Sequence, residues 1–103
     1  MDRRIDRVFI YLLTNKKEGV IYTGLTTNLM KRMEEHRNKC ADGFTKKYNA
    51  TRLVYYEIHQ DIEQAAHRER LMKKWKRDWK IELIEKENPN WDDLYEDVKR
   101  NWN

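Results

Sequence analysis

The chain has 103 residues, of which 39% are hydrophobic and 39% are charged. This length supplies one hydrophobic core and excludes two independently folded domains, so we expect one domain over residues 1–103 with its core at about 8–95. No stretch approaches the roughly 18 consecutive apolar residues of a membrane span, and we expect no targeting signal at the N-terminus. The single cysteine, Cys40, excludes an intramolecular disulfide and suits a reducing cytoplasm. We therefore expect a soluble, cytoplasmic protein with no membrane partner.

The net charge is only +4, but it is unevenly distributed along the chain. Residues 67–80 hold seven Lys or Arg against two acidic side chains, whereas residues 81–103 hold three basic and seven acidic ones. The basic segment also contains Trp75 and Trp79, which suits binding of phosphates by charge and of bases by stacking. A solvated helix face with surface ion pairs is the alternative.

Three segments are predicted to be strands. Residues 8–13 (VFIYLL) and 20–25 (VIYTGL) are apolar, β-branched and aromatic, and the polar segment between them ends in Gly19, which predicts a hairpin. Residues 52–59 (RLVYYEIH) supply the third strand.

Helices are predicted between and after the strands. Thr26 or Thr27 can cap a helix over residues 28–40, whose apolar face includes His36 and Cys40. Residues 42–49 (DGFTKKYN) are predicted to be a loop. Asp61, with Gln64 three residues later, forms a capping box that opens a helix at about residues 62–76.

The C-terminal part is less regular. Residues 79–85 (WKIELIE) alternate like a strand, although the length of the segment and its neighbours favour a short helix at least as much. After Pro89, the apolar residues from Trp91 to Val98 predict one or two amphipathic helical turns. Strands with helices laid on the sheet predict an α/β (α+β) fold.

Several polar residues occupy positions that core packing does not explain. Glu69 falls in the middle of the apolar face of the 62–76 helix, where a carboxylate either binds a hard cation such as Mg²⁺ or Mn²⁺ or pairs with Lys73 in water. Arg32 and His36 share a face of the 28–40 helix and could bind a phosphate together. The alternative, which is commoner in proteins, is that such a histidine is a hydrogen-bonded core residue.

Two tyrosines lie on the predicted hairpin. Tyr11 and Tyr22 can place their rings on the same side of the sheet, as core residues or as catalysts with a pKa shifted by a nearby cation. Gly24, two residues after Tyr22, removes a side chain from that face and lets a backbone or ligand come close.

Taken in order, these residues resemble a GIY-YIG nuclease domain. The features that carry the resemblance are FIY at 9–11, YTG at 22–24, NLMKRMEEH at 28–36 and a glutamate in a later helix. Phe9 and Thr23 stand where the family pattern has Gly and Ile. The GFTKKYN, LVYYE, KKWKRDWK and NPNWDDLY segments are similar to those of small, stand-alone members predicted to be endonucleases.

The resemblance implies a central three-stranded antiparallel sheet flanked by helices, and hydrolysis of phosphodiester bonds with one divalent metal, Mg²⁺ or Mn²⁺. It implies that Tyr11 is the general base, that Tyr22 orients the water or the phosphate, and that Glu69 is the metal ligand. It also implies that Arg32 stabilises charge on the phosphate and that His36 assists proton transfer. Asn88 lies near the position at which some members carry a polar residue toward the end of the domain.

The leading hypothesis is a metal-dependent endonuclease acting on nucleic acid, with DNA favoured over RNA. A nucleic-acid-binding module that keeps the fold without cleaving is the main alternative. A protein-binding role for the acidic tail, with Trp91 and Trp102, is a third. The residues expected to contact the nucleic-acid backbone are Lys46, Lys47, Arg68, Arg70, Lys73, Lys74, Lys76 and Arg77.

Overall fold

A computed structural model of the chain describes residues 7–38 and 43–102, in which three strands form a single antiparallel sheet. The strands are β1 (Val8–Thr14), β2 (Ile21–Thr26) and β3 (Arg52–His59), in the order β2-β1-β3. β1 is therefore the central strand and β2 an edge strand. The sheet confirms the predicted fold class and its three strands.

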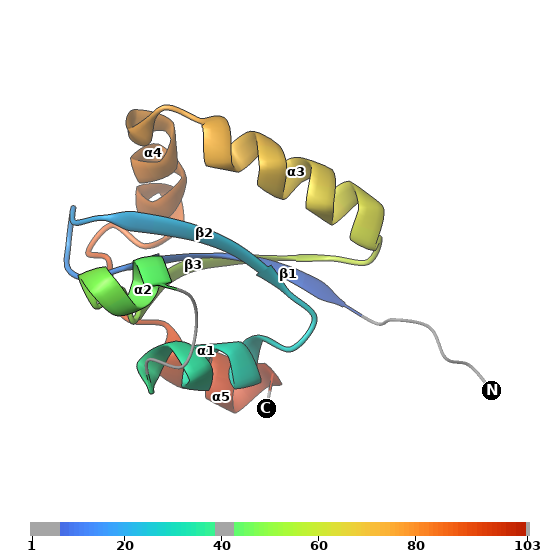
Figure 1. The fold of residues 1–103 in the computed structure, drawn as a ribbon, viewed down its shortest axis with the longest axis horizontal. Coiled ribbons are helices and arrows are strands. Elements are labelled where there is room, and N and C mark those ends of the chain that lie inside the picture. The colour runs from blue at the N-terminus through green and yellow to red at the C-terminus, as the bar shows by residue number, and fades with distance from the viewer. Residues whose placement is uncertain (1–6, 39–42, 103) are drawn as a thin grey trace.

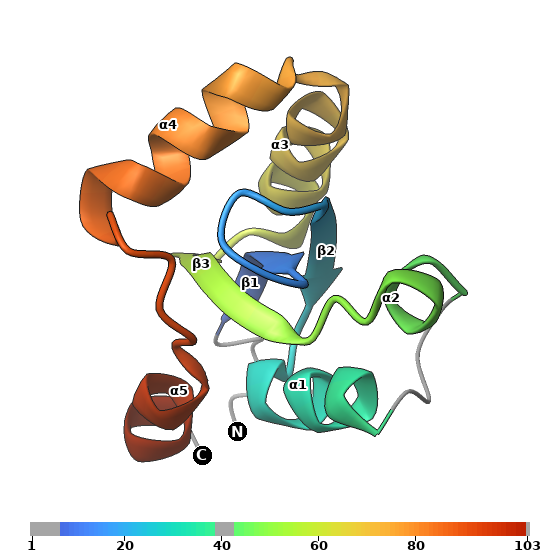
Figure 2. The same ribbon diagram turned by 90° about the vertical axis from the view of Figure 1, so that its left-hand side faces the viewer.

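Five helices surround this sheet in the described residues. Figures 1 and 2 show α3 and α4 on one side of the sheet, α1 and α5 on the other, and α2 near β2. The α3 helix packs on β2 and β1, and α1 packs against α5. The helices are α1 (Leu29–Arg37), α2 (Gly43–Tyr48), α3 (Ile62–Lys74), α4 (Arg77–Glu87) and α5 (Tyr95–Trp102).

Both faces of β1 are buried, and alternate residues enter two separate cores. Ile10 and Leu12 pack with Met72 of α3 and Ile84 of α4. Phe9, Tyr11 and Leu13 pack on the opposite face, together with side chains from α1 and α5. Because successive side chains of a strand point to opposite faces, this one strand separates the two layers of helices.

Helix starts follow local capping chemistry. Asp61 caps α3 as predicted, because its carboxylate accepts hydrogen bonds from the backbone N–H groups of Glu63 (2.9 Å) and Gln64 (3.4 Å). The cap of α1 is Asn28, not Thr26 or Thr27, and its side chain accepts from the N–H of Lys31 at 3.1 Å. Thr26 instead bonds to the backbone of Asn28. The described part of α1 ends at Arg37, and Cys40 lies outside the described residues.

The loop predicted at residues 42–49 is wrong for residues 43–48, which form the helix α2; Asp42 lies outside the described residues. A helix this short gains little from propensity and depends on tertiary packing. Thr45 is the residue that α2 buries. Asn49 follows the helix with a φ of 57°, a left-handed conformation that asparagine tolerates at helix ends.

The alternation at residues 79–85 does not produce a strand. The segment belongs to α4, which buries Ile84 and leaves Trp79 half exposed. The last amphipathic segment forms α5, with Val98 buried. In the described residues no helix is both long and apolar enough to cross a membrane.

Candidate active site

Tyr11, Tyr22 and His36 come together on the α1 side of the sheet. The register pairs Tyr11 with Gly24 and Leu13 with Tyr22, so both tyrosines project from the same face. His36, the next-to-last residue of α1, places its Nε2 at 3.0 Å from the Tyr11 hydroxyl. The ring of Tyr22 lies 6.3 Å from that of Tyr11 and 5.7 Å from that of His36, centre to centre.

Gly24 makes room for the Tyr11 ring. A Cβ atom built on Gly24 overlaps the hydroxyl end of that ring, so no larger residue fits while Tyr11 keeps its place. The close approach expected at Gly24 is therefore made by a side chain of the protein's own core. Tyr11 is only 1% exposed, and its hydroxyl is held where His36 can reach it.

The α2 helix completes this group with residues that the sequence did not single out. The Thr45 hydroxyl lies 3.1 Å from Nδ1 of His36. Phe44 stacks on Tyr22 at a ring distance of 5.8 Å and contacts Tyr48 at 4.9 Å. Residues 42–49 carry no hydrophobic period that would have revealed an inward-facing threonine, so only the fold shows its role.

Arg32 lies one turn before His36 on α1, beside a polar cavity of about 180 Å³. Its guanidinium donates to Glu35 at 3.1 Å, and both side chains are more than a third exposed. An exposed pair of this kind contributes little to stability, so the guanidinium can exchange Glu35 for another anion at small cost. The cavity is lined by Thr26, Thr27, Asn28, Lys31, Arg32 and Glu35.

Glu69 faces the sheet from α3, as its spacing predicts. It lies four residues after Ala65 and three before Met72, the two residues that α3 buries, and its side chain is 13% exposed. Its carboxylate pairs with Nζ of Lys73 at 3.0 Å, which is the ion-pair alternative, although the side chain is largely buried and not surrounded by water. Glu69 lies in the α3 layer and Tyr11 in the core of the other layer, so a site that uses both must reach across β2, the edge strand.

The donor set at Glu69 fits a hydrated hard cation. A single carboxylate is a common protein ligand for Mg²⁺, which retains several of its waters. Residues 7–38 and 43–102 contain no group of three or more His, Cys, Asp or Glu side chains placed to share a metal. Glu69 would therefore be the protein ligand, and the ammonium of Lys73 would have to leave the carboxylate.

Arg68, expected to contact a nucleic-acid backbone, is instead paired with Glu57, although its side chain is 37% exposed. Its guanidinium donates two hydrogen bonds to Glu57 of β3 and lies over the ring of Trp75. Tyr55 and His59 also bond to Glu57, at 2.5 and 2.8 Å. Burial by itself raises the pKa of Glu57, but the bonds from Arg68, Tyr55 and His59 outweigh it and lower that pKa to about 2. Burial and the bond to Glu57 raise the pKa of Tyr55.

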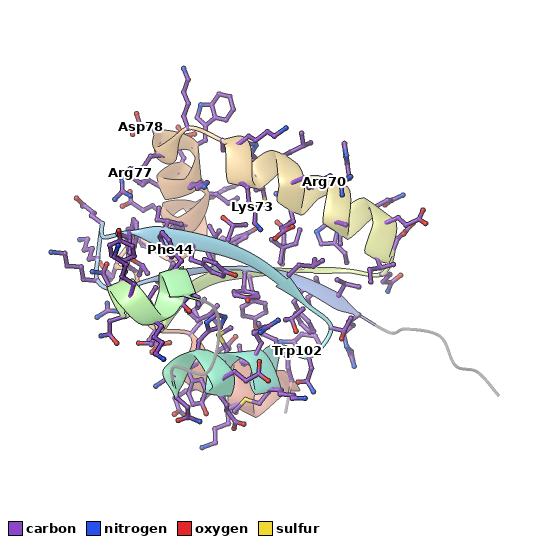
Figure 3. The ribbon with its side chains drawn as sticks, viewed as in Figure 1. Phe44, Arg70, Lys73, Arg77, Asp78 and Trp102 are labelled. Atoms are coloured by element: carbon purple, nitrogen blue, oxygen red, sulfur yellow. The ribbon has the colours of Figure 1, made fainter. Side chains whose placement is uncertain are left out.

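The other basic residues fall into two groups. Lys73 pairs with Glu69, and Arg77 donates to the backbone carbonyls of Glu18 (2.6 Å) and Gly19 (2.7 Å), which ties the β1–β2 turn to α4. Figure 3 shows Arg70 and Lys73 on α3, and Arg77 near the start of α4, on the side of the sheet opposite Trp102. The remaining residues predicted to contact the backbone, Lys46, Lys47, Arg70, Lys74 and Lys76, are exposed and take no part in the ion pairs described above.

Asn88 is buried and holds the segment that follows α4. Its side-chain amide donates to the carbonyls of Val54 (3.0 Å) and Asp92 (2.9 Å), and its oxygen accepts from the N–H of Asp92 at 3.0 Å. These bonds fix the 88–92 segment against β3. These bonds give Asn88 a structural role. That it also matches a polar residue found toward the end of the domain in some members of the family stays a prediction.

Comparison with known proteins gives one consistent result. Residues 7–82 match the model of the GIY-YIG catalytic domain. A UPF0213 protein of Clostridium perfringens is 38% identical over 76 residues, which cover 74% of this chain and 81% of the relative. A UPF0213 protein of Syntrophus aciditrophicus is 34% identical over 82 residues, covering 79% and 92%. The solution NMR structure of the UPF0213 protein BH0048 from Bacillus halodurans superposes with a TM-score of 0.53 at 25% identity, covering 85% of this chain and 93% of that one.

Gly24→Ala should displace Tyr11 from His36. The added methyl overlaps the end of the Tyr11 ring, and relief of such overpacking typically costs about 1–3 kcal/mol. We expect a lower free energy of unfolding in urea and a shifted His36 imidazole resonance. Gly43→Ala is the matched control, because a Cβ at Gly43 meets nothing within 4 Å. A Gly24→Ala protein with wild-type stability and an unmoved His36 signal would contradict the packing described here.

Acid should weaken the link between β3 and α3. Since the pKa of Glu57 is about 2 in the folded protein and 4.5 in its ordinary state, the unfolded chain takes up the proton first as pH falls. The resulting stability, about 3 kcal/mol, is complete above pH 4.5 and is lost as pH falls toward 2. Urea unfolding from pH 7 to pH 2.5 should show this loss. Glu57→Gln should flatten the profile and the exposed Glu82→Gln should not; equal profiles for both would rule out this role of Glu57.

Proposed function

Because this chain belongs to the GIY-YIG family, the family of a nuclease catalytic domain, we propose that it is an endonuclease that hydrolyses phosphodiester bonds in DNA, with one divalent metal held by Glu69. The observation that carries the proposal is the buried hydrogen bond between the Tyr11 hydroxyl and His36, with Tyr22 packed against both rings. A phenol held against an imidazole at this distance is arranged for proton transfer.

In this proposal Tyr11 is the general base. His36 takes up the phenol proton, and the resulting phenolate removes a proton from the attacking water. Tyr11 is 1% exposed, so it exchanges protons only with groups in contact with it, and the reacting water must reach it when nucleic acid binds. Tyr22, half-buried beside it, is placed to orient that water or the scissile phosphate.

Arg32 is proposed to hold the phosphate. The cavity beside it also contains Lys31, so two cations face a space of about 180 Å³. A guanidinium matches the geometry of a phosphate, and its fixed charge stabilises the negative charge that grows on the phosphate oxygens. Binding there replaces the exposed contact to Glu35.

Glu69 is proposed to hold Mg²⁺ or Mn²⁺. A bound divalent cation neutralises charge on the phosphate and helps the leaving oxygen depart. Glu69 lies on α3, which packs on β2 and β1, whereas Tyr11 is buried on the opposite face of the sheet, so the bound phosphate would have to reach both groups around the edge at β2.

The exposed cations are the best candidates for contacts to the nucleic-acid backbone. Lys46 and Lys47 lie on α2, next to Phe44 of the tyrosine cluster, and Arg70, Lys74 and Lys76 lie along α3 and just after it. Arg68, Lys73 and Arg77 can join them only by giving up the contacts described above. Burial and the charges of Arg77 and Lys73 lower the pKa of Lys80, so positive charge is concentrated around the end of α3 and the start of α4.

A binding module without cleavage is the second candidate. It is favoured by the pairing of Glu69 with Lys73 and by the burial of the Tyr11 hydroxyl, since both must change before hydrolysis. DNA is preferred to RNA as the substrate, and a reducing cytoplasm as the compartment, as parts of the same proposal.

Cleavage should require both the metal and Glu69. We expect the purified chain to nick supercoiled, branched or single-stranded DNA in Mg²⁺ or Mn²⁺ and to be inactive in EDTA. Glu69→Gln should lower the rate at least about 100-fold, as expected for loss of one charge-stabilising group. Glu63→Gln, an exposed carboxylate on the same helix, should not. A gel shift with no product in any metal would support the binding module, and an RNA of the same sequence tests the preference for DNA.

Binding should weaken steeply with salt. If about five cations contact phosphates, the affinity should fall roughly 10²–10³-fold between 50 and 200 mM salt, because each contact releases a counterion. Replacing Lys46 and Lys47 together by Ala should reduce the slope of log affinity against log salt by about 1–2. Lys99→Ala on α5 is the control and should leave the slope unchanged. The assignment of these lysines fails if the double variant keeps the wild-type slope.

A further inference from the structure

We propose that Thr45 is a positioning residue that fixes the tautomer of His36, keeping a proton on Nδ1 so that Nε2 is left to accept the proton of Tyr11. The inference rests on the proposed function for its catalytic meaning, but its structural content does not depend on nuclease activity. It concerns three side chains from three elements: Tyr11 of β1, His36 of α1 and Thr45 of α2.

The hydrogen bonds that His36 makes with Tyr11 and Thr45 are compatible with two arrangements of protons. A neutral imidazole has one N–H donor and one bare nitrogen acceptor. Nε2 lies 3.0 Å from the Tyr11 hydroxyl and Nδ1 lies 3.1 Å from the Thr45 hydroxyl. Either Tyr11 donates to Nε2 and Nδ1–H donates to Thr45, or Thr45 donates to Nδ1 and Nε2–H donates to Tyr11.

The acidities of the two hydroxyls favour the first arrangement. A phenol has a reference pKa of about 10, whereas an aliphatic hydroxyl does not titrate in the range of protein side chains. The phenol is therefore the better donor to a bare imidazole nitrogen, and the threonine hydroxyl is left as the acceptor for Nδ1–H. The hydrogen bond at one ring nitrogen decides what the other nitrogen can do.

Because all three side chains are buried, the loss of either hydrogen bond is energetically costly. Tyr11, His36 and Thr45 are 1%, 2% and 2% exposed, so water does not substitute easily for a lost hydroxyl at Nδ1. In surroundings of low dielectric the two hydrogen bonds also polarise each other. The Thr45 bond thus biases His36 toward the form in which Nε2 accepts.

The proton transfer that follows is balanced. The O–H bond of Tyr11 breaks and an Nε2–H bond forms, which gives a phenolate and an imidazolium. The imidazolium keeps its Nδ1–H bond to Thr45, which remains an acceptor throughout. The phenolate then takes a proton from water and leaves hydroxide, while the first proton stays on His36.

The test is the tautomer of His36, read from its side-chain ¹⁵N resonances in the full chain. We expect the wild type to show Nδ1–H as the dominant neutral form. Thr45→Val keeps the shape and removes the hydroxyl, and it should lower the ratio of Nδ1–H to Nε2–H roughly three- to tenfold, the size of one neutral hydrogen bond. Thr45→Ser should restore the ratio. His59, which bonds to Glu57, is the internal control and should not change.

The outcomes separate this inference from the proposed function. Nε2–H as the dominant form of the wild type overturns the inference without any variant, so a misfolded Thr45→Val protein does not leave it untested. An unchanged ratio in Thr45→Val also overturns it, and a changed ratio with undiminished cleavage overturns its catalytic meaning. Absence of cleavage by the wild type defeats the proposed function instead, and the wild-type tautomer still decides whether Thr45 positions His36.

Discussion

The central strand β1 constrains everything else in this protein, because both of its faces are buried. Its even-numbered side chains, such as Ile10 and Leu12, hold the α3 and α4 layer, and its odd-numbered ones, such as Phe9 and Tyr11, hold the α1 and α5 layer. Tyr11 is therefore a core residue and a candidate catalytic residue at once. A site on this scaffold has little freedom to move the phenol, so the partners of the phenol must be brought to it.

The side chains that contact Tyr11 belong to segments that a sequence predicts with unequal success. The strands, the Asp61 cap and the face of α1 that carries His36 follow from short-range patterns, and all three were predictable. The α2 helix was not, because its contacts to His36 and Tyr22 are tertiary and its own sequence reads as a turn. The choice of Asn28 as the cap of α1 was likewise decided by geometry, since three neighbouring residues were chemically able to cap.

The basic segment, residues 67–80, shows that the sequence also fails to predict which charged side chains are engaged by the protein itself. In the sequence its cations form one set, and nothing distinguishes Arg68 or Arg77 from Lys74. The structure distinguishes them through partners distant in the chain: Glu57 of β3 for Arg68, and the carbonyls of Glu18 and Gly19 for Arg77. Helical spacing placed Glu69 on the apolar face of α3 but left open a rotated face; the burial of Ala65 and Met72 in the structure turns the carboxylate toward the sheet.

The two arginines that anchor the fold have a practical consequence for mutational mapping. Replacing Arg77 frees the β1–β2 turn, and replacing Arg68 leaves Glu57 buried with fewer donors; either change loosens the hairpin or the helix next to the site. A screen scored only by retention on a DNA column would count both as interface residues, although their effect is architectural. Melting temperatures measured alongside would separate such scaffold positions from side chains that meet the ligand.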